Sequence, residues 1–319
     1  MRAMGLAALT ALALAGGAAA QERAFRFLSV GAGELDGGYY AVAGAICEAV
    51  NTAERGWLRC SREATPGSRY NVESLLSDEL DFALVQSDIL DHAYAGRAIY
   101  AGRPPQSGLR RVARLYVETV TILARPEAGV LSQRDLGGKR VDIGPPASGR
   151  NATTRALLSA LDLDLSFFGE TTTLQSAAAI EALCAGRIDA AIFVIGHPSA
   201  LVSEALARCG ARVAPMQGPA VAALNASAPY FTPGVIPKAD YPTLAADVPS
   251  IGVAAILAAG ADMPDAVVEA VTAAMLDRLP ALSRATPLLA RLDPDGMRRG
   301  AGAAPLHDGA AAAYAAAAE

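Results

Sequence analysis

The sequence predicts an α/β protein with two similar lobes. Residues 63–88 have the pattern of a strand end, a turn, a helix and a second strand, which together make a βαβ unit. A similar stretch at 185–193 lies 108 residues further along the chain, and such an echo indicates a second lobe of the same kind. Two strand-like runs, 116–124 and 250–257, could carry the chain from one lobe to the other and back.

The first twenty residues are typical of a secretory signal peptide. They hold one charge, Arg2, followed by an unbroken run of small and apolar residues that ends in Ala18-Ala19-Ala20. A transmembrane anchor fits less well, because it needs about 20 apolar residues and a more hydrophobic run. We therefore expect a periplasmic protein that loses residues 1–20 and does not insert into the membrane.

The composition of the exported chain excludes several partners. Removal of the signal leaves 319 − 20 = 299 residues, enough for two domains, and a net charge of −5 − 1 = −6. Because the sequence contains no basic tract, we expect neither nucleic acid nor an anionic membrane as a partner. We also expect the protein to be a monomer. An anionic solute remains compatible with this charge, since backbone N–H groups and one or two arginines act locally.

The cysteines predict two disulfides. Cys47, Cys60, Cys184 and Cys209 lie in an exported chain, where an oxidising compartment favours disulfides over free thiols. Three connectivities are possible, and proximity in the sequence favours Cys47–Cys60 and Cys184–Cys209, each contributing about 3 kcal/mol. The sequence has neither a Cys-x-x-Cys nor a neighbouring pair of histidines, so we expect no metal site and no cofactor.

A glycine-rich stretch containing Gly33 follows the first predicted strand at 25–30. Apolar spacing then predicts a helix at 42–51. The glycines match neither a dinucleotide-binding fingerprint nor a Walker loop. Two interpretations of Tyr39 and Tyr40 remain open: they line a pocket, or they cover the edge of the first sheet.

The turn before the helix that begins near Tyr70 is a candidate anion site. The first turn of a helix has unpaired N–H groups and the positive end of the helix dipole, so an anion is favoured there. Ligands of open α/β sheets bind beyond the carboxyl ends of strands, where this turn lies. The candidate residues are Thr65, Gly67, Ser68 and Asn71.

A second candidate turn follows the short apolar strand at 80–85 and consists of Gln86, Ser87 and Asp88. It too lies at the carboxyl end of a strand. Its carboxylate could receive the ammonium of an amino acid, so acidic amino acids and plain dicarboxylates both remain open as ligands.

The echo places Asp81 and Asp189 at matching positions, each directly before an apolar strand. Thr65 and Thr173 each precede the matching aspartate by sixteen residues, so the spacing of the turns repeats as well. We expect both aspartates to be structural, capping or pairing near their own turn rather than binding ligand.

The crossing strands define the predicted domains. Residues 1–20 are the signal peptide, 21–118 with 258–319 form lobe 1, and 119–257 form lobe 2. A connector rich in proline, glycine and charge is predicted at 126–138. A last long helix at 264–279 begins with proline at a favoured early position, and we expect it to pack on lobe 1.

A third candidate turn, in the second lobe, joins a strand ending at Ile143 to a helix at 150–161. Ser148 could be a plain N-cap or bond a ligand carboxylate, and Arg150 could be a solvated charge or the nearest positive charge to the ligand. Both interpretations remain open. The candidate residues are Gly144, Ser148, Gly149 and Arg150.

His197 lies in a turn after the strand predicted at 189–194 and is the last candidate for ligand contact. A lone histidine in a turn more often makes a structural hydrogen bond. A periplasmic hydrolase would need a nucleophile, a histidine base and a carboxylate, but Ser148 lies in no Gly-x-Ser-x-Gly elbow and no His-Glu-x-x-His is present. We therefore expect no enzymatic activity.

Six short motifs carry a resemblance to a known family. They are Gly37-Gly38-Tyr39-Tyr40, Thr65-Pro66-Gly67-Ser68-Arg69-Tyr70-Asn71, Leu80-Asp81-Phe82-Ala83-Leu84-Val85-Gln86-Ser87-Asp88, Ser148-Gly149, Gly196-His197-Pro198 and Ala304-Pro305-Leu306-His307. Together they resemble the TAXI group of extracytoplasmic solute receptors, which serve TRAP secondary transporters. The resemblance implies a two-lobed periplasmic-binding fold, type II-like, that closes on a small anion, commonly an acidic amino acid or a dicarboxylate.

Two departures from that family leave the ligand open. Pro66 stands where the family usually has glycine, and Pro145-Pro146-Ala147 replaces a loop with more glycine, so that the basic residue here is Arg150. The predicted function is capture of a carboxylate such as glutamate or 2-oxoglutarate, with delivery to the membrane subunits of a TRAP transporter. A receptor for an ABC importer or a sensor kinase has the same fold and remains an alternative. The expected mechanism is closure of the two lobes on the anion.

Overall fold

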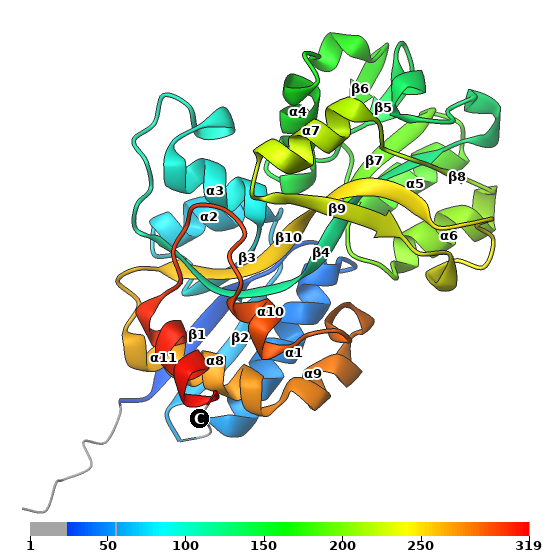
Figure 1. Cartoon of the computed structure of the whole chain (residues 1–319). Helices are drawn as coiled ribbons and strands as arrows, with labels where there is room; N and C mark the ends of the chain where they lie inside the picture. The colour runs from blue at the N-terminus through cyan, green and yellow to red at the C-terminus, as the bar shows by residue number, and fades with distance from the viewer. Residues whose placement is uncertain (1–23, 55, 319) are drawn as a thin grey trace, which may run out of the picture.

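The computed structural model describes residues 24–54 and 56–318, so the predicted signal peptide, 1–20, lies outside the described residues. Two groups of helices and strands are joined by two long strands (Figure 1). In the described ranges, no helix has both the length and the apolar character of a membrane span. The assignment of 21–118 and 258–319 to lobe 1 and of 119–257 to lobe 2 stays a prediction, and we keep those names.

The elements follow one another as short strands and helices in both lobes. The strands are β1 (Arg26–Gly31), β2 (Leu58–Glu63), β3 (Phe82–Gln86), β4 (Leu109–Ala124), β5 (Arg140–Asp142), β6 (Glu170–Thr172), β7 (Ala190–Ile195), β8 (Arg212–Ala214), β9 (Phe231–Ile236) and β10 (Val248–Gly260). The α-helices are α1 (Gly38–Ala53), α2 (Ser68–Leu76), α3 (Ser87–Ala95), α4 (Gly149–Ala160), α5 (Ser176–Cys184), α6 (Ala200–Cys209), α7 (Pro219–Ser227), α8 (Asp265–Asp277), α9 (Leu279–Ala285), α10 (Pro294–Arg298) and α11 (Asp308–Ala316). The 3-10 turns are η1 (Ala98–Tyr100), η2 (Pro126–Ala128), η3 (Gln133–Leu136), η4 (Leu165–Phe167), η5 (Lys238–Asp240) and η6 (Pro287–Leu289).

The ten strands of the described chain form one mixed sheet in the order β2-β1-β3-β10-β4-β7-β5-β6, with β8 paired to β4 and β9 to β10. β1 pairs in parallel with β2 and β3, and β5 pairs in parallel with β6 and β7. Parallel neighbours need crossover helices, which cover both faces of the sheet in each lobe. The predicted α/β class is therefore observed.

The two lobes share β4 and β10, which run through both in Figure 1. The second half of β10 pairs with β3, while its first half pairs with β9. The last six residues of β4, Thr119–Ala124, pair with β7. Both strand-like runs that the sequence marked as crossings therefore lie within these two strands.

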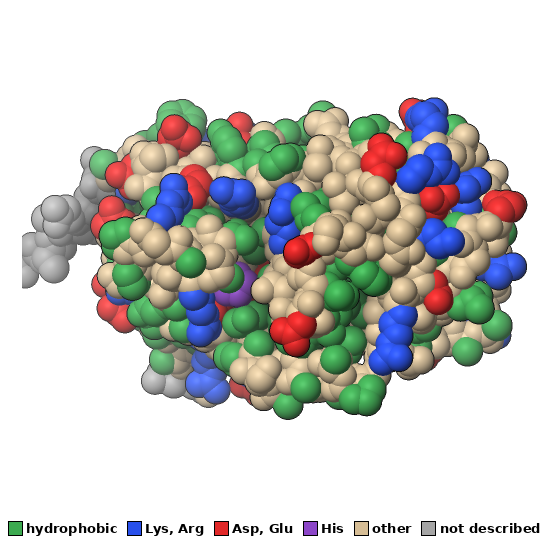
Figure 2. Space-filling model, turned by 90° about the horizontal axis from the view of Figure 1, so that it is seen from above, with side chains coloured by type: hydrophobic (Ala, Val, Ile, Leu, Met, Phe, Trp, Pro, Cys, Tyr) green, Lys and Arg blue, Asp and Glu red, His purple; other side chains and the backbone are tan. Residues whose placement is uncertain are grey.

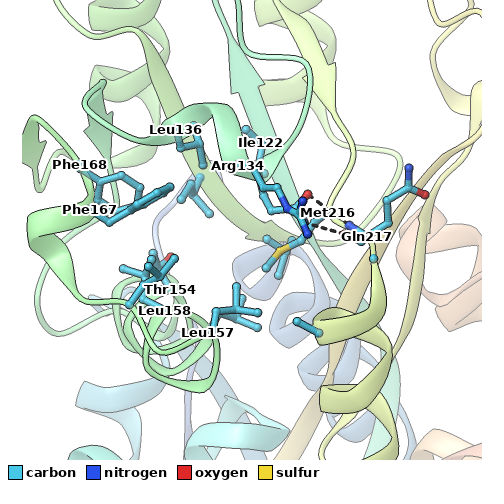
Figure 3. A pocket seen from close by; sticks show the side chains of 17 residues that line it. Ile122, Arg134, Leu136, Thr154, Leu157, Leu158, Phe167, Phe168, Met216 and Gln217 are labelled. Carbon is cyan, nitrogen blue, oxygen red and sulfur yellow. Dashed lines mark hydrogen bonds between the residues drawn. The ribbon is translucent and has the colours of Figure 1, made fainter.

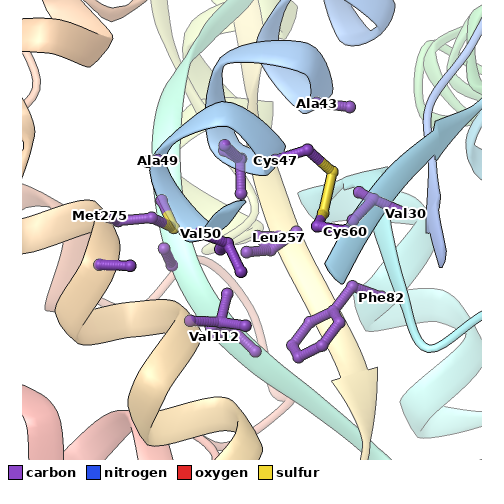
Figure 4. Packing of buried hydrophobic residues seen from close by; sticks show 14 of the residues in the cluster. Val30, Ala43, Cys47, Ala49, Val50, Cys60, Phe82, Val112, Leu257 and Met275 are labelled. Atoms are coloured by element: carbon purple, nitrogen blue, oxygen red, sulfur yellow. A yellow bond between two sulfur atoms is a disulfide. The ribbon is translucent and has the colours of Figure 1, made fainter. Parts of the chain in front are cut away.

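The larger core of lobe 1 lies between the sheet and helices α1 and α8. Val42, Ile46 and Val50 recur at helical spacing on α1 and are at most 1% exposed. Met275 of α8 packs against the same cluster, and Figure 4 shows it beside Val50. The prediction that the helix after Pro264 packs on lobe 1 is confirmed.

Both predicted disulfides are present, Cys47–Cys60 in lobe 1 and Cys184–Cys209 in lobe 2. The first ties α1 to β2 at the edge of the core drawn in Figure 4. The second ties the end of α5 to the end of α6. Each bond links neighbouring elements of one lobe, which is why proximity in the sequence predicted the pairing.

The two echo aspartates have equivalent places. Asp81 accepts hydrogen bonds from the Ser29 backbone N–H and the Arg26 guanidinium, both of β1. Asp189 accepts them from the backbone N–H and the side chain of Arg140 at the start of β5, and from Arg125. Each carboxylate holds the start of one parallel strand beside the next. The predicted pairing is present, but the partners lie on a neighbouring strand rather than in the aspartates' own turns, and the expectation that neither binds ligand stays a prediction.

Two predicted boundaries were wrong. α1 begins at Gly38, four residues before the predicted start, so that Tyr39 and Tyr40 lie in its first turn. β3 passes directly into α3, which begins at Ser87, so the predicted turn at 86–88 is the first turn of a helix. In both places a strand or loop enters a helix without a capping side chain, and the sequence therefore lacked the usual start signal.

The surface carries both signs of charge. On the face drawn in Figure 2, acidic and basic side chains are interspersed rather than gathered in one basic patch. This face therefore offers no electrostatic footprint for nucleic acid.

Candidate functional site

A cavity of about 100 Å³ lies between the lobes, at the carboxyl ends of β3 and β7. Its lining residues come from both lobes: Gly33, Glu34, Gly37, Gly38, Tyr39, Pro66, Gly67, Ser68, Gln86, Glu118, Pro145, Ser148, Gly149, Arg150, Ser176, Phe193, Val194, Ile195 and Leu201. At this size the cavity has room only for a small solute.

Several helices begin at this cavity. Residues of the first turns of α1, α2 and α4 line it, and so do Ser176 of α5 and Leu201 of α6. α1 and α2 have no side-chain hydrogen bond at their N-caps. Because helix N-termini present unpaired N–H groups and partial positive charge, the cavity is suited to an anion.

Arg150 supplies a full positive charge to the cavity. Its guanidinium is buried, with one nitrogen paired to Asp142 and Nε donating to the backbone oxygen of Ile192. The Phe193 ring lies under it, with Cζ 4.0 Å from the ring centroid. Burial lowers the pKa of Arg150, and Asp142 opposes that shift. Nη1 has no hydrogen-bond partner among the described residues, so the cavity contains a charged donor that lacks an acceptor.

Asp142 fixes the position of Arg150. Its carboxylate is fully buried and also accepts hydrogen bonds from the Gly144 and Leu174 N–H groups and the Thr172 hydroxyl. A buried charge pair needs such additional hydrogen bonds to offset desolvation. Arg150 is therefore a held charge rather than a solvated surface residue.

Two glycines allow the close packing around Arg150. Gly144 has φ +81°, and a Cβ there would lie 2.7 Å from the Arg150 side chain. A Cβ on Gly149 would lie 1.9 Å from the Gln86 side-chain oxygen, across the boundary between the lobes. Glycine at 149 therefore lets the start of α4 approach lobe 1.

A carboxyl group, Glu118 of β4, faces the cavity from the opposite side. Tyr39 donates a 2.7 Å hydrogen bond to its Oε2. Burial raises the pKa of Glu118 to about 8, a shift that hydrogen bonds from Tyr39 and Gln86 only partly offset. At neutral pH the group is thus mostly protonated and can donate a hydrogen bond to a ligand oxygen.

A hydrogen-bonded contact between the lobes lies behind the cavity. Thr153 of α4 donates to the carboxylate of Asp88 and lies 3.2 Å from the side-chain oxygen of Gln86. Burial raises the pKa of Asp88 to about 7, and its Oδ1 has no partner among the described residues. Asp88 is fully buried and does not line the cavity, so it is not positioned to receive a ligand ammonium.

The mouth of the cavity is a groove of about 890 Å³ between the lobes. Thr65 and Thr173, the matching threonines of the echo, both line it. Glu34 lines both the cavity and the groove. Its carboxylate accepts a 3.1 Å hydrogen bond from the N–H of Ser176 at the start of α5. A carboxylate of lobe 1 thus already occupies a helix N-terminus of lobe 2.

Eight of the sequence-predicted residues line the cavity: Gly33, Tyr39, Gly67, Ser68, Gln86, Ser148, Gly149 and Arg150. The other seven do not. Thr65 lines the groove, and Gly144 packs against Arg150. Asn71, Ser87 and Asp88 are fully buried, which leaves Tyr40 and His197.

Tyr40 and His197 face other parts of the fold. The Tyr40 ring lies under the Arg62 guanidinium, 4.0 Å from its Cζ. His197 hydrogen-bonds to the hydroxyls of Thr121 and Tyr241, and burial lowers its pKa to about 4, so it is neutral. Its geometry fits the structural interpretation of a lone histidine.

The side chains of Asn71 and Ser87 stabilise the backbone near the cavity. Asn71 donates to the backbone oxygens of Ala32 and Leu84, which joins the ends of β1 and β3. Ser87 donates to the Tyr230 oxygen and accepts from the Ala254 N–H. Both side chains are fully used by the protein.

Sequence reasoning missed two carboxyls at the site, Glu34 and Glu118, together with Phe193. Glu118 had a signal: it is the lone charge in the predicted strand 116–124. Glu34 lies in a loop and gave none. In the described chain, no cluster of three or more metal-binding side chains is present.

Comparison with known proteins supports the fold. A sequence model described as the NMT1-like family matches residues 30–316. A protein of Bordetella bronchiseptica RB50 is 17% identical, with TM-score 0.58 over 92% of this chain and 98% of that chain. MatC of Rhodopseudomonas palustris, solved with bound malate, is 15% identical, with TM-score 0.56 over 83% and 88%. PhnD1 of Prochlorococcus marinus, in complex with methylphosphonate, is 11% identical, with TM-score 0.52 over 83% and 90%.

Proposed function

The chain belongs to the NMT1-like family, and from this premise we propose that it captures a small carboxylate outside the cytoplasm and delivers it to a TRAP transporter. It has the type II periplasmic-binding fold and is a solute-binding protein for a small ligand rather than an enzyme. The observation that carries the proposal is the unpartnered Nη1 of buried Arg150, in a cavity where several helices begin. A ligand carboxylate supplies the acceptor that this donor lacks.

The proposed ligand is an acidic amino acid or a dicarboxylate. One carboxylate binds Arg150 and the first turn of α4, with Ser148 and Gly149 beside it. The other polar group of the ligand meets Glu118, Tyr39 and the Ser68 region across the cavity. Protonated Glu118 donates to a second carboxylate, whereas ionised Glu118 receives an ammonium.

Export to the periplasm is part of the proposal. The predicted signal peptide and the two disulfides support it, since disulfides persist in oxidising compartments. The TAXI resemblance supports a TRAP partner over an ABC importer or a sensor kinase. A gene for a large multispanning permease beside this one favours TRAP transport, and an ATPase gene favours ABC import.

Mass spectrometry of the ligand released on denaturing the purified protein tests the proposal directly. A thermal-shift panel complements it: a ligand at about 100 times its dissociation constant adds about 2.7 kcal/mol to stability. We expect an acidic amino acid or dicarboxylate to stabilise the protein and its mono-ester to lose most of the effect. Stabilisation by neutral sugars or cationic amines alone would contradict the proposal.

A further inference from the structure

Lobe 2 contains a second cavity, of about 240 Å³. It shares no lining residue with the cavity and groove between the lobes, which together are called the cleft. It lies between the sheet, α4, α7 and the η3 and η4 turns. Figure 3 shows Phe167 and Phe168 on one side of it, Met216 on the other, and Leu157 and Leu158 of α4 below. At about 240 Å³ the cavity has room for a small ligand.

The walls of this cavity are apolar. Ile122, Leu157, Phe168, Ile192 and Met216 all line it and belong to one buried hydrophobic cluster. An apolar cavity of about 150 Å³ stays dry and binds benzene, so this larger one has room for a ring or short chain with a polar group attached.

Two of the polar side chains that line the cavity already have partners in the protein. The Thr154 hydroxyl donates to the backbone oxygen of Arg150. The Gln133 amide donates to the backbone oxygen of Gln217 and accepts from its N–H, the contact marked in Figure 3. These groups therefore offer little to a ligand.

Arg134 differs from them. It lines the cavity, is exposed, and its guanidinium makes no hydrogen bond or ion pair with any described residue. An arginine beside an apolar cavity complements an anionic head group on an apolar body.

We propose that this cavity is a second ligand site, for a small monocarboxylate whose apolar body is an aromatic ring or a chain of about six to eight carbons. The body fills the space between α4 and η4, and the carboxylate meets Arg134. The site is separate from the cleft and does not depend on the function proposed for it.

Benzoate, benzyl alcohol and benzylamine are the probes, in an NMR titration of the protein labelled at methionine and isoleucine methyl groups. The Met216 methyl reports on the cavity, and Met275 and Met297 in lobe 1 serve as internal controls. We expect benzoate to shift Met216 and Ile192, benzyl alcohol to bind more weakly and benzylamine weakest. An unmoved Met216 with any probe overturns the proposal, including the case where benzoate binds only in the cleft.

Variants separate the charge from the cavity. Arg134→Gln should weaken benzoate binding roughly two- to fivefold, to the level of benzyl alcohol, as for an exposed ion pair. Arg187→Gln, at an exposed arginine of lobe 2 that lines none of the cavities described here, is the matched control and should change nothing. Equal effects of the two variants overturn the assignment of the carboxylate to Arg134.

Ala220→Trp and Leu163→Trp fill the cavity from two exposed lining positions, so neither removes buried core. Each should abolish the Met216 shift while the melting temperature stays near that of the wild type. Unchanged benzoate binding in the folded variants overturns the site, and so does sedimentation showing that a second copy of the chain covers it.

Discussion

The two lobes contribute different polar groups to the cavity between them. Lobe 1 presents two carboxyl groups, Glu34 and Glu118, together with the starts of α1 and α2. Lobe 2 presents Arg150, held by Asp142, at the start of α4. Neither half alone has the groups to bind both ends of a charged solute. We therefore expect affinity to depend on closure, because closure brings the groups of both lobes to the same ligand.

The largest expected effect is on stability, when the buried Arg150 of lobe 2 is replaced. Arg150→Ala leaves Asp142 buried without its partner, so we expect the free energy of unfolding to fall by about 3–5 kcal/mol. Binding of the stabilising carboxylate should weaken by about 1.5–3 kcal/mol. Urea unfolding and calorimetry measure the two effects.

Arg187→Ala is the matched control, since Arg187 is an exposed arginine of the same lobe and does not line the cavity. It should change neither quantity by more than about 0.5 kcal/mol. Unchanged affinity in Arg150→Ala would show that lobe 1 holds the anion.

The next largest effect is the loss of stability when the disulfide of either lobe is removed. Replacing Cys47 and Cys60, or Cys184 and Cys209, with serine should each lower stability by about 3 kcal/mol. The lobe 2 loop, with a sequence separation of 25 against 13, should cost about 0.6 kcal/mol more by the chain-entropy formula. Peptide mapping without reductant checks the pairing, and recovery of a Cys47–Cys184 peptide would contradict it.

Local sequence patterns predicted one half of the site well. Ser68, Ser148 and Arg150 lie where a strand meets a helix start, and such junctions have recognisable turn residues. The echo around Asp81 and Asp189 was a local pattern too, although the partners of these aspartates lie 52 and 49 residues away in the sequence, on a neighbouring strand.

The other half depended on tertiary structure. Which way Glu118 points follows from its register on β4, and a one-residue slip would turn it to the other face of the sheet. The contact of Glu34 with α5 exists only when the lobes meet. Asp88 was misplaced because β3 continues directly into α3, so its side chain turns into the protein and not into the cleft.

The variant Glu118→Gln tests whether the carboxyl group of lobe 1 contacts the ligand. Burial raises the pKa of Glu118 to about 8, so below that pH the neutral acid donates to a dicarboxylate. Affinity for a dicarboxylate should fall about tenfold, or 1.4 kcal/mol, for each pH unit above 8. Affinity for an amino acid should instead rise with pH through about 8, because its ammonium prefers the ionised carboxylate.

Calorimetry between pH 6 and pH 9 follows the pH dependence of binding. Glutamine cannot titrate, so the variant should lose the change of affinity that is centred near pH 8. Equal pH dependence in the wild type and the variant would show that Glu118 does not contact the ligand.

The smallest expected effect is the difference between Asp189→Asn and Asp81→Asn. Asp189 pairs with two guanidinium groups and its side chain is 15% exposed, whereas Asp81 pairs with one and is 22% exposed. Both variants should lower stability more than affinity, and Asp189→Asn should cost about 1 kcal/mol more than Asp81→Asn. Urea unfolding at pH 7 measures the difference.

The contribution of Asp189 also depends on pH. The hydrogen bond from Arg140 is the largest cause of the lowered pKa of Asp189, so its contribution is present above the ordinary value of 3.8 and is lost as the pH falls below it. Unfolding at pH 3 should therefore bring Asp189→Asn closer to the wild type than unfolding at pH 7 does. A carboxylate that joins two parallel strands should affect stability more than ligand affinity. A tenfold loss of affinity in either variant, with an unchanged melting temperature, would therefore contradict the structural assignment of that aspartate.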